Sequence, residues 1–228
     1  MSSDNPSDRP NNPPSDPKQA PPVQESSFKN FLTDNLPTVA VAVLLAVGVR
    51  VFVAEPRYIP SSSMEPTLLI DDRLIIDKLS IRWRKPERGE IIVFNPPINP
   101  VVPDASKVYI KRVIGLPGDR ISIYDGKVFI NDEPLNEPYI AAPINYTLPT
   151  QDAALCPNCF RPEKVEVGKK HPFFTVPEGS YWVMGDNRNN SLDSHAWGFM
   201  PAENLVGRAM FRYWPLDNRT GNLSIPKY

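Results

Sequence analysis

The chain has 228 residues and a net charge of −1 at pH 7, which is long enough for a membrane anchor and one sizeable domain. The near-neutral charge gives no basic footprint and argues against a nucleic acid partner. The 28 prolines argue against an all-helical body and favour short strands and turns. With only two cysteines there is no disulfide framework, so a hydrophobic core must hold the fold together.

The N-terminal part of the chain divides into a polar tail and an apolar run. Residues 1–26 are rich in proline and polar side chains, and such a segment buries too little surface to offset chain entropy. We therefore expect a disordered tail. Within 27–55, an apolar run from Leu36 to Ala54 is interrupted only by Arg50. About twenty such residues span the hydrocarbon core as a helix, and the long Arg50 stem can reach the headgroups.

Two alternatives to a retained transmembrane helix are a buried core helix and a cleavable signal peptide. A core helix rarely needs so long an apolar run in a domain of this size. The signal-peptide pattern fits poorly, because the preceding tail is long and Phe52 would occupy position −3 if cleavage followed Ala54. Charge does not decide the orientation, since lysines precede the span while Arg50 and Arg57 end or follow it.

Beyond the span, short runs of branched and aromatic residues bounded by turn formers predict a mainly β, mostly antiparallel body. The predicted strands cover 73–78, 90–94, 107–114, 121–124, 127–130, 180–184 and 205–214. Asp125-Gly126 lies between two of these runs and is a strong signal for a two-residue hairpin turn. Between 131 and 177 the pattern breaks into a proline-rich polar connection.

Cys156 and Cys159 form a Cys-x-x-Cys motif within that connection. A single pair is half of a zinc ribbon, and only His171 and His195 are available elsewhere as histidine ligands. The βαβ setting of a thioredoxin-like redox motif is also missing. On the trans side of a membrane a local disulfide is the ordinary outcome, so we favour a disulfide over zinc, and zinc over redox catalysis.

Three polar motifs follow the span in order. The first is the turn Pro60-Ser-Ser-Ser-Met-Glu-Pro-Thr-Leu68, the second is Tyr-Ile-Lys-Arg at 109–112 with Gly-Leu-Pro-Gly-Asp at 115–119, and the third is Gly-Asp-Asn-Arg-Asn-Asn-Ser-Leu-Asp-Ser at 185–194. A serine beside an apolar wall has the features of a nucleophile, and a lysine whose pKa is lowered by burial can serve as its base. Taken singly, each motif is explained equally well as a polar loop, a surface strand or a turn.

Together and in this order, the motifs resemble those of type I signal peptidases, the membrane-bound serine proteases that remove signal peptides from exported proteins. The likeness runs from about Arg57 to Arg208, and the residues of the motifs are most similar to those of cyanobacterial and thylakoid members. It implies a β-sheet catalytic domain over 56–130 and 178–228, with a small variable non-catalytic insertion at 131–177. It also implies a cytoplasmic tail and a catalytic domain on the trans side of the plasma or thylakoid membrane.

The resemblance assigns a catalytic role to residues of each motif. It implies that Ser63 is the nucleophile and Lys111 the general base. Ser61 and the backbone N–H of Ser63 then form the oxyanion hole. Ser191 is expected to hydrogen-bond and orient the neutral Lys111 amine, and Asp193 to support it electrostatically.

Four further residues are expected to support this site. Gly185 permits close packing near the lysine, and Arg112 and Asp186 have a structural role as charged partners. His195 stands where many relatives carry arginine. Because the Ser-His relatives place their histidine where this chain has its lysine, we expect His195 to be a partner of Asp193 and not the base.

The resemblance also places small apolar subsites for the −1 and −3 side chains of a substrate. The residues expected to line them are Tyr58, Ile59, Met64, Leu68, Tyr109 and Ile110. Shallow apolar pockets exclude large side chains, which suits the small-x-small end of a signal peptide. The expected partners are preproteins and the lipid bilayer, with no metal and no cofactor.

Two other functions fit parts of the sequence. One is a self-cleaving Ser-Lys protein related to the SOS-response repressors, but those are soluble and lack the motif at 185–194. The other is a membrane-tethered β domain that binds exported peptides without cutting them. The presence of both Ser63 and Lys111 argues against a pure binding module.

Overall fold

The computed structural model describes residues 25–98, 102, 106–168 and 170–228, with side chains from Thr33 onward. The tail expected at 1–26 lies almost wholly outside the described residues. Residues 46–228 form one compact unit, separate from the segment that ends at Leu45.

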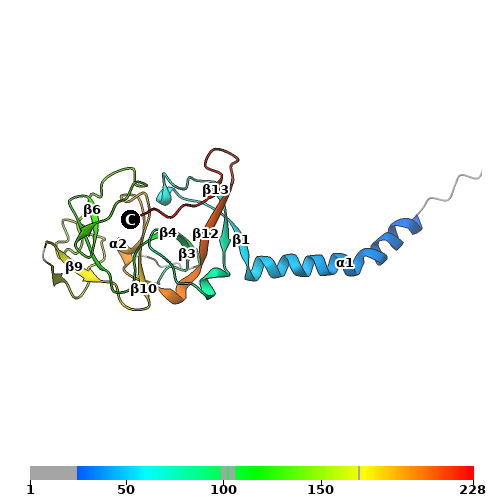
Figure 1. The fold of residues 1–228 in the computed structure, drawn as a ribbon, viewed down its shortest axis with the longest axis horizontal. Helices are drawn as coiled ribbons and strands as arrows, with labels where there is room; N and C mark the ends of the chain where they lie inside the picture. The colour runs from blue at the N-terminus through cyan, green and yellow to red at the C-terminus, as the bar shows by residue number, and fades with distance from the viewer. Residues whose placement is uncertain (1–24, 99–101, 103–105, 169) are drawn as a thin grey trace, which may run out of the picture. The chain divides into compact units, whose positions relative to one another are not determined.

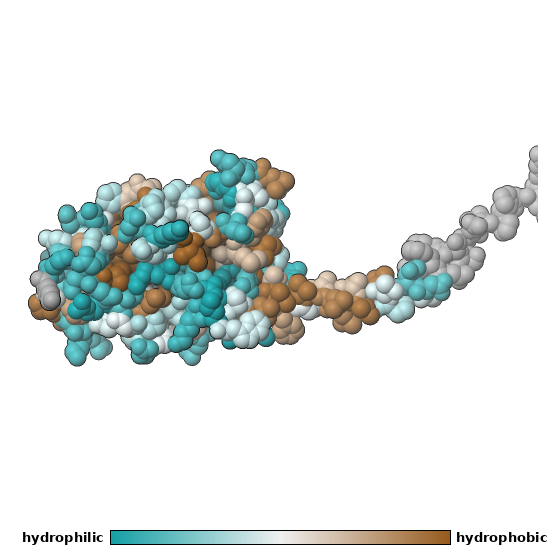
Figure 2. All heavy atoms as spheres, viewed as in Figure 1, coloured by the Kyte–Doolittle hydropathy of each residue, from teal (hydrophilic) through white to brown (hydrophobic). Residues whose placement is uncertain are grey.

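Helix α1 covers Glu25–Phe52, close to the range 27–55 expected for the transmembrane helix. Its stretch Thr33–Phe52 is long and apolar enough to cross a membrane, and none of its most apolar window is buried by the rest of the protein. Figure 2 shows these apolar side chains on the helix surface. An apolar surface without a protein partner is stable in a hydrocarbon medium, so the helix suits a bilayer.

The remainder of the described chain is mainly β (Figure 1). The strands are β1 (Ala54–Tyr58), β2 (Arg73–Asp77), β3 (Ile91–Phe94), β4 (Tyr109–Gly115), β5 (Arg120–Tyr124), β6 (Lys127–Ile130), β7 (Glu133–Pro134), β8 (Glu166–Val167), β9 (Pro172–Thr175), β10 (Ser180–Met184), β11 (Met200–Pro201), β12 (Leu205–Trp214) and β13 (Gly221–Asn222). The short helices are η1 (Ser62–Met64), η2 (Ser80–Arg82), η3 (Ala202–Asn204) and α2 (Ser194–Trp197). The predicted fold class is confirmed.

The strands form two sheets in which every pair is antiparallel. The larger sheet has the order β1-β2-β12-β3-β4-β10-β11, with β13 paired to β12. The smaller sheet has the order β7-β6-β5-β9-β8. The predicted hairpin joins β5 to β6, and both Asp125 and Gly126 adopt the positive φ that such a turn requires.

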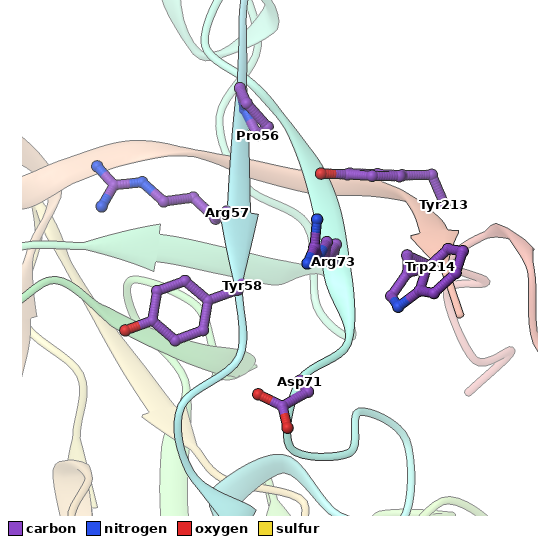
Figure 3. A pocket seen from close by; sticks show the side chains of 7 residues that line it. All are labelled: Pro56, Arg57, Tyr58, Asp71, Arg73, Tyr213 and Trp214. Atoms are coloured by element: carbon purple, nitrogen blue, oxygen red, sulfur yellow. The ribbon is translucent and has the colours of Figure 1, made fainter. Parts of the chain in front are cut away.

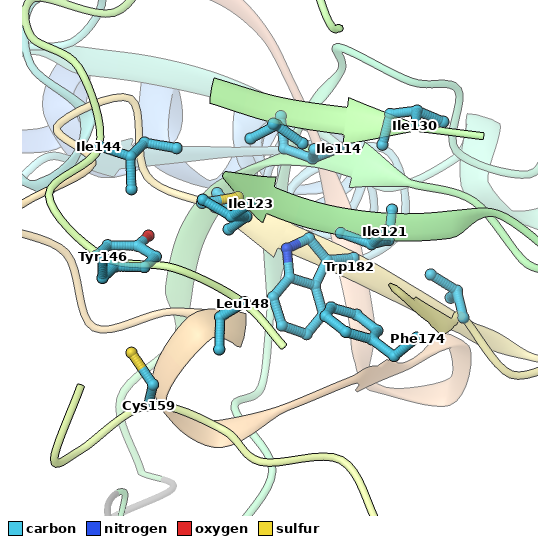
Figure 4. Packing of buried hydrophobic residues seen from close by; sticks show 13 residues of the cluster. Ile114, Ile121, Ile123, Ile130, Ile144, Tyr146, Leu148, Cys159, Phe174 and Trp182 are labelled. Carbon is cyan, nitrogen blue, oxygen red and sulfur yellow. The ribbon is translucent and has the colours of Figure 1, made fainter. Parts of the chain in front are cut away.

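The smaller sheet does not follow the boundary expected at 130/131. It combines β5 and β6, which precede that boundary, with β7, β8 and β9, which follow it. The core between the sheets explains the arrangement (Figure 4). Ile121 of β5 and Phe174 of β9 pack in one buried cluster with Trp182 of β10, so the 131–177 interval and the preceding hairpin share a core.

A second buried cluster lies under the serine-rich turn. Met64 and Leu68 are fully buried and pack with Leu74 of β2 and Val93 of β3. Burying one such side chain stabilises the fold by about 1.5–3 kcal/mol. Apolar residues that flank the turn therefore anchor it on the larger sheet.

Candidate active site

The nucleophile candidate Ser63 lies in the middle of η1, a single 3₁₀ turn between β1 and β2. Its neighbour Met64 is fully buried, and Ser63 itself is only 8% exposed. The proline-bounded sequence favours a tight turn, and the apolar residues that follow it draw the serine side chain into the protein. A hydroxyl in this position is shielded from bulk water.

Lys111 lies on β4, a strand inside the larger sheet, where it pairs with Ile92 of β3. The lysine is 4% exposed, and its Nζ lies 2.8 Å from Ser63 Oγ. The same Nζ also donates to the carbonyl oxygen of Ile110 at 2.9 Å. Two residues that are 48 positions apart in the sequence thus form a buried contact between an amine and a hydroxyl.

Burial changes the proton affinity of this amine. Desolvation lowers the pKa of Lys111 from its ordinary value of 10.5 to about 8, while the nearby carboxylates of Asp193 and Asp186 oppose that decrease. A buried lysine loses its proton more readily because the charged form is poorly solvated. The geometry and the pKa therefore suit a lysine that accepts a proton from a serine near neutral pH.

Ser61 approaches the nucleophile, whereas Ser191 does not make the bond expected of it. Ser61 Oγ lies 3.4 Å from Ser63 Oγ, next to the place where an oxyanion donor is needed. Ser191 Oγ is close enough to Asp193 to help lower the pKa of that carboxyl. It is buried, however, and has no hydrogen-bond partner of normal geometry in the described part of the chain. The expected hydrogen bond from Ser191 to Lys111 is absent from this structure, in which the amine contacts Ser63 and a backbone carbonyl.

Asp193 is fully buried and is held on both carboxylate oxygens. Burial raises the pKa of Asp193, but hydrogen bonds from His195 and from the Gly185 N–H outweigh this effect and lower it overall. His195 Nδ1 donates to Asp193 Oδ1 at 2.8 Å, and its ring stacks on Tyr146. No hydrogen bond joins His195 to Ser63 or Lys111 among the described residues. The histidine thus lies where a partner of Asp193 is expected and not where a base would be.

Arg112 and Asp186 form a buried bidentate ion pair, with donor-acceptor distances of 2.8 Å and 2.6 Å. Gly185 lies directly before this aspartate and against the serine-rich turn at 60–68, the nucleophile turn. A Cβ at position 185 would lie 2.3 Å from Ser191 Oγ and 2.4 Å from the Ser63 carbonyl oxygen. Real Cβ atoms do not approach so closely, so the backbone contact requires glycine at this position.

Two asparagines in the third motif hold the nucleophile turn, and sequence reasoning did not assign them a role. The Asn187 backbone N–H donates to the Ser63 carbonyl at 3.1 Å, and its Nδ2 donates to the Ser62 carbonyl at 3.2 Å. Asn190 Nδ2 donates to Ser62 Oγ at 3.1 Å. The sequence signal for this role is the group of amide side chains at 187, 189 and 190, because each amide offers both hydrogen-bond donors and an acceptor.

The residues expected to line the substrate subsites fall into three places. Ile59, Met64 and Leu68 belong to the buried cluster under the nucleophile turn, with Ile110 packed against it. Tyr109 packs against a different cluster, and its ring centroid lies 5.6 Å from Lys111 Nζ. Tyr58 is 65% exposed and lines a separate cavity. Met64 and Leu68 have no exposed surface, so a substrate side chain would reach them only after neighbouring side chains shift.

Cys156 and Cys159 form a disulfide with a Cα–Cα distance of 5.3 Å. Among the described residues, no group of three or more His, Cys, Asp or Glu side chains is placed to hold a metal ion.

The fold and the site define a mainly β protein in which a buried serine hydroxyl meets a buried lysine amine. The model of a protein family described as signal peptidase, peptidase S26, matches residues 32–214, and the chain belongs to this family. The resemblance inferred from the motifs is therefore confirmed.

Curated relatives agree with this membership. A probable signal peptidase I-2 from Synechocystis sp. is 48% identical over 88% of this chain and 81% of its own length. A signal peptidase I from Leptolyngbya laminosa is 43% identical over 99% of this chain and 98% of its own length. A probable thylakoidal processing peptidase 2 from Arabidopsis thaliana is 37% identical over 82% of this chain and 45% of its own length.

Proposed function

We propose that the protein is a type I signal peptidase, a membrane-bound serine endopeptidase that cleaves signal peptides from exported preproteins after small residues at −3 and −1. The observation that carries the proposal is the 2.8 Å contact between Lys111 Nζ and Ser63 Oγ, both of which are buried. Family membership and the names of the relatives support the same activity.

In the proposed reaction, the neutral Lys111 amine takes the Ser63 hydroxyl proton as Oγ attacks the carbonyl carbon of the −1 residue. The resulting oxyanion accepts hydrogen bonds from the Ser61 hydroxyl and the Ser63 N–H. The Lys111 ammonium then gives its proton to the leaving amine, and the peptide bond breaks to leave an ester on Ser63. Lys111 next takes a proton from a water molecule as that water attacks the ester carbonyl carbon. The bond between this carbon and Ser63 Oγ then breaks, Lys111 returns the proton to Oγ, and the signal peptide leaves with a free carboxyl group.

The anchor helix and the disulfide support the finer localisation that we propose. An apolar helix of twenty residues next to the β domain would keep the site at the membrane surface, where a signal peptide ends. A structural disulfide at Cys156–Cys159 suits a compartment on the trans side of the plasma or thylakoid membrane, with the tail in the cytoplasm.

The test is cleavage of a purified preprotein with alanine at −3 and −1 by the full-length protein in detergent. Ser63→Ala and Lys111→Ala should each lower kcat by at least about ten-thousandfold, because the two groups act as one unit. His195→Ala should retain cleavage at the signal junction. Lys127→Ala, which removes an exposed lysine of β6, serves as the matched control and should be unaffected.

Two outcomes would contradict the proposal. If Lys111→Ala stays active while His195→Ala is inactive, the base is a histidine. If the unaltered protein binds the preprotein but never cuts it, the domain is a tethered binding module.

A further inference from the structure

A cavity with a volume of about 520 Å³ lies at one end of the larger sheet, where β1, β2 and β12 are adjacent (Figure 3). It is lined by Pro56, Arg57, Tyr58, Asp71, Arg73, Tyr213 and Trp214. None of the residues proposed to transfer protons or hold the oxyanion lines it. The cavity therefore lies outside the proposed dyad and oxyanion hole, and it shares only Tyr58 with the residues that the resemblance assigns to substrate subsites.

A row of three large side chains crosses the sheet at this cavity. Tyr58 pairs with Arg73 on the neighbouring strand, and Arg73 pairs with Trp214 on the strand after that. Residues that are directly opposite in adjacent strands share a face of the sheet. Figure 3 shows the Arg73 guanidinium between the Tyr58 and Trp214 side chains. Tyr58 is 65% and Trp214 48% exposed, so two aromatic surfaces flank a cation at the protein surface.

An irregularity in β12 brings a third aromatic residue to the same cavity. Arg212 pairs with Leu74 and Trp214 with Arg73, which leaves Tyr213 as an extra residue in β12. Regular alternation would place Tyr213 and Trp214 on opposite faces of the sheet, whereas a bulge changes the direction of a side chain. As a result, Tyr213 and Trp214 both line the cavity.

The charged residues that line the cavity are Arg57, Arg73 and Asp71, and the latter two have no ion-pair partner among the described residues. Arg57 forms an ion pair with Glu55 at 2.7 Å. Arg73 makes no side-chain hydrogen bond or ion pair with any residue that the structure describes, and this includes Asp71 at the cavity wall. A guanidinium presents a planar set of donors that matches two oxygens of a phosphate. The Arg73 guanidinium is therefore suited to bind a phosphate group.

Part of the cavity wall lies close in sequence to the end of α1, and this indicates which kind of ligand would carry the phosphate. Arg57 follows Phe52, the last residue of α1, by five residues, which is a chain length of at most about 18 Å. Arginine, tyrosine and tryptophan are favoured at the membrane interface, where anionic headgroups attract cations. Exposed apolar residues also adjoin the lining residues in sequence, namely Leu69, Ile70 and Leu216. These apolar groups suit the glycerol and acyl part of a lipid and would add nothing to the binding of free phosphate.

We infer that this cavity binds the headgroup of an anionic phospholipid, with Arg73 on the phosphate and with Tyr58 and Trp214 on either side of it. Such a site would hold the β1–β2–β12 end of the sheet at the level of the headgroups. The inference depends on α1 lying in a bilayer and is independent of peptidase activity.

Native mass spectrometry of the full-length protein tests this site. The protein in non-ionic detergent is given equal amounts of dioleoyl phosphatidylglycerol and dioleoyl phosphatidylcholine, and the bound lipids are compared. The unaltered protein should retain phosphatidylglycerol preferentially. Arg73→Gln should lower that preference about fivefold, as expected for one arginine at an anionic surface. Arg161→Gln makes the same charge change at an exposed arginine outside this cavity and should keep the full preference.

Three results would overturn the inference: an unchanged preference in Arg73→Gln, an equal loss in Arg161→Gln, or no preference in the unaltered protein. A second arm adds millimolar inorganic phosphate to the lipid-bound protein. Retention of phosphatidylglycerol supports a lipid site, whereas displacement would show that the cavity takes the free anion. Because Arg73 is exposed, the fold of the variant should survive, and circular dichroism checks this.

Discussion

At the scale of single residues, the protonation state of Lys111 decides whether the proposed dyad can work. An ammonium group cannot accept the Ser63 proton, so only the neutral fraction of the lysine is active. Desolvation lowers the pKa of Lys111 to about 8, and the Asp193 and Asp186 carboxylates keep it from falling further. The neutral fraction of Lys111 therefore increases with pH and approaches its maximum above the pKa.

We therefore expect kcat/KM for preprotein cleavage to rise about tenfold per pH unit below neutrality and to level off above a midpoint near pH 8. Asp193→Asn removes a negative charge that favours the ammonium form, so the midpoint should move to lower pH. Asp152→Asn, at an exposed site in the 131–177 interval, should leave the midpoint in place. A midpoint that rises or stays constant in Asp193→Asn would contradict this electrostatic account.

The resemblance supplied several pairings of the site, such as Ser63 with Lys111 and His195 with Asp193, but the sequence did not show the geometry that brings them together. Ser63 and Lys111 were assigned from motifs, yet their contact depends on the pairing of β3 with β4 and on the turn that precedes β2. For Ser191, the motif implied a bond to the lysine, while the amine has its partners elsewhere. Hydrogen-bond partners depend on tertiary geometry at the level of a few tenths of an ångström, which a motif does not encode.

At the scale of elements, the nucleophile turn depends on a second turn about 125 residues further along the chain. Asn187 donates through its backbone to the Ser63 carbonyl and through its side chain to the Ser62 carbonyl. These bonds fix the backbone on which the Ser63 hydroxyl is carried. A small displacement of a reacting group is enough to reduce catalysis strongly.

Asn187→Ala removes the side-chain donor and leaves the backbone bond in place. We expect kcat to fall by about tenfold to a hundredfold with little change in KM, because the hydroxyl is misplaced while the substrate contacts remain. The pH midpoint should stay at its native value, since the surroundings of Lys111 are unchanged. Steady-state kinetics of preprotein cleavage measure both quantities.

Asn189→Ala is the matched control for that experiment. Asn189 belongs to the same turn, but its side chain accepts from the Asn145 N–H and donates to the Pro143 carbonyl, and among the described residues it makes no hydrogen bond to the nucleophile turn. An equal loss of kcat in both variants would show that the whole turn loosens and that Asn187 has no separate role.

The strands were predictable where their side chains alternate or are uniformly apolar. The predicted ranges 180–184 and 205–214 coincide with β10 and β12, and the Asp125-Gly126 hairpin is present. The short helix α2 was not anticipated, because four residues carry no helical periodicity. Its start depends on the Asp193 side chain, which accepts from the His195 N–H and so acts as a cap.

At the scale of the whole molecule, a buried ion pair connects the 131–177 interval to the turn that supports the proposed active site. Arg188 bonds both oxygens of Glu137, and its Nε donates to the Gly185 carbonyl at 3.0 Å. The exposed fractions of the two charged side chains are 1% and 4%. The domain boundary predicted at 130/131 could not reveal this link, because pairing across it depends on strand order and not on local pattern.

Glu137→Ala would leave the Arg188 guanidinium buried without its counter-charge. Removing one partner of a buried pair costs about 3–5 kcal/mol of unfolding free energy, because the remaining charge is poorly solvated. In a domain of this size we expect the melting temperature to fall by roughly 6–20 °C. Thermal unfolding of the full-length protein in detergent, followed by tryptophan fluorescence, measures the change.

Glu133→Ala provides the comparison, since the same substitution there removes an exposed pair with Lys170 at 3.5 Å, in which Glu133 is 77% exposed. Exposed pairs contribute about 0–1 kcal/mol, so the melting temperature should change by only a few degrees. If the two variants have the same melting temperature, Arg188 finds water or another acceptor once Glu137 is removed. The ion pair between the 131–177 interval and the 185–194 turn then contributes little to stability. If only Glu137→Ala melts early, the smaller sheet and the active-site turn are stabilised as one structure, and the insertion is part of what keeps Ser63 in place.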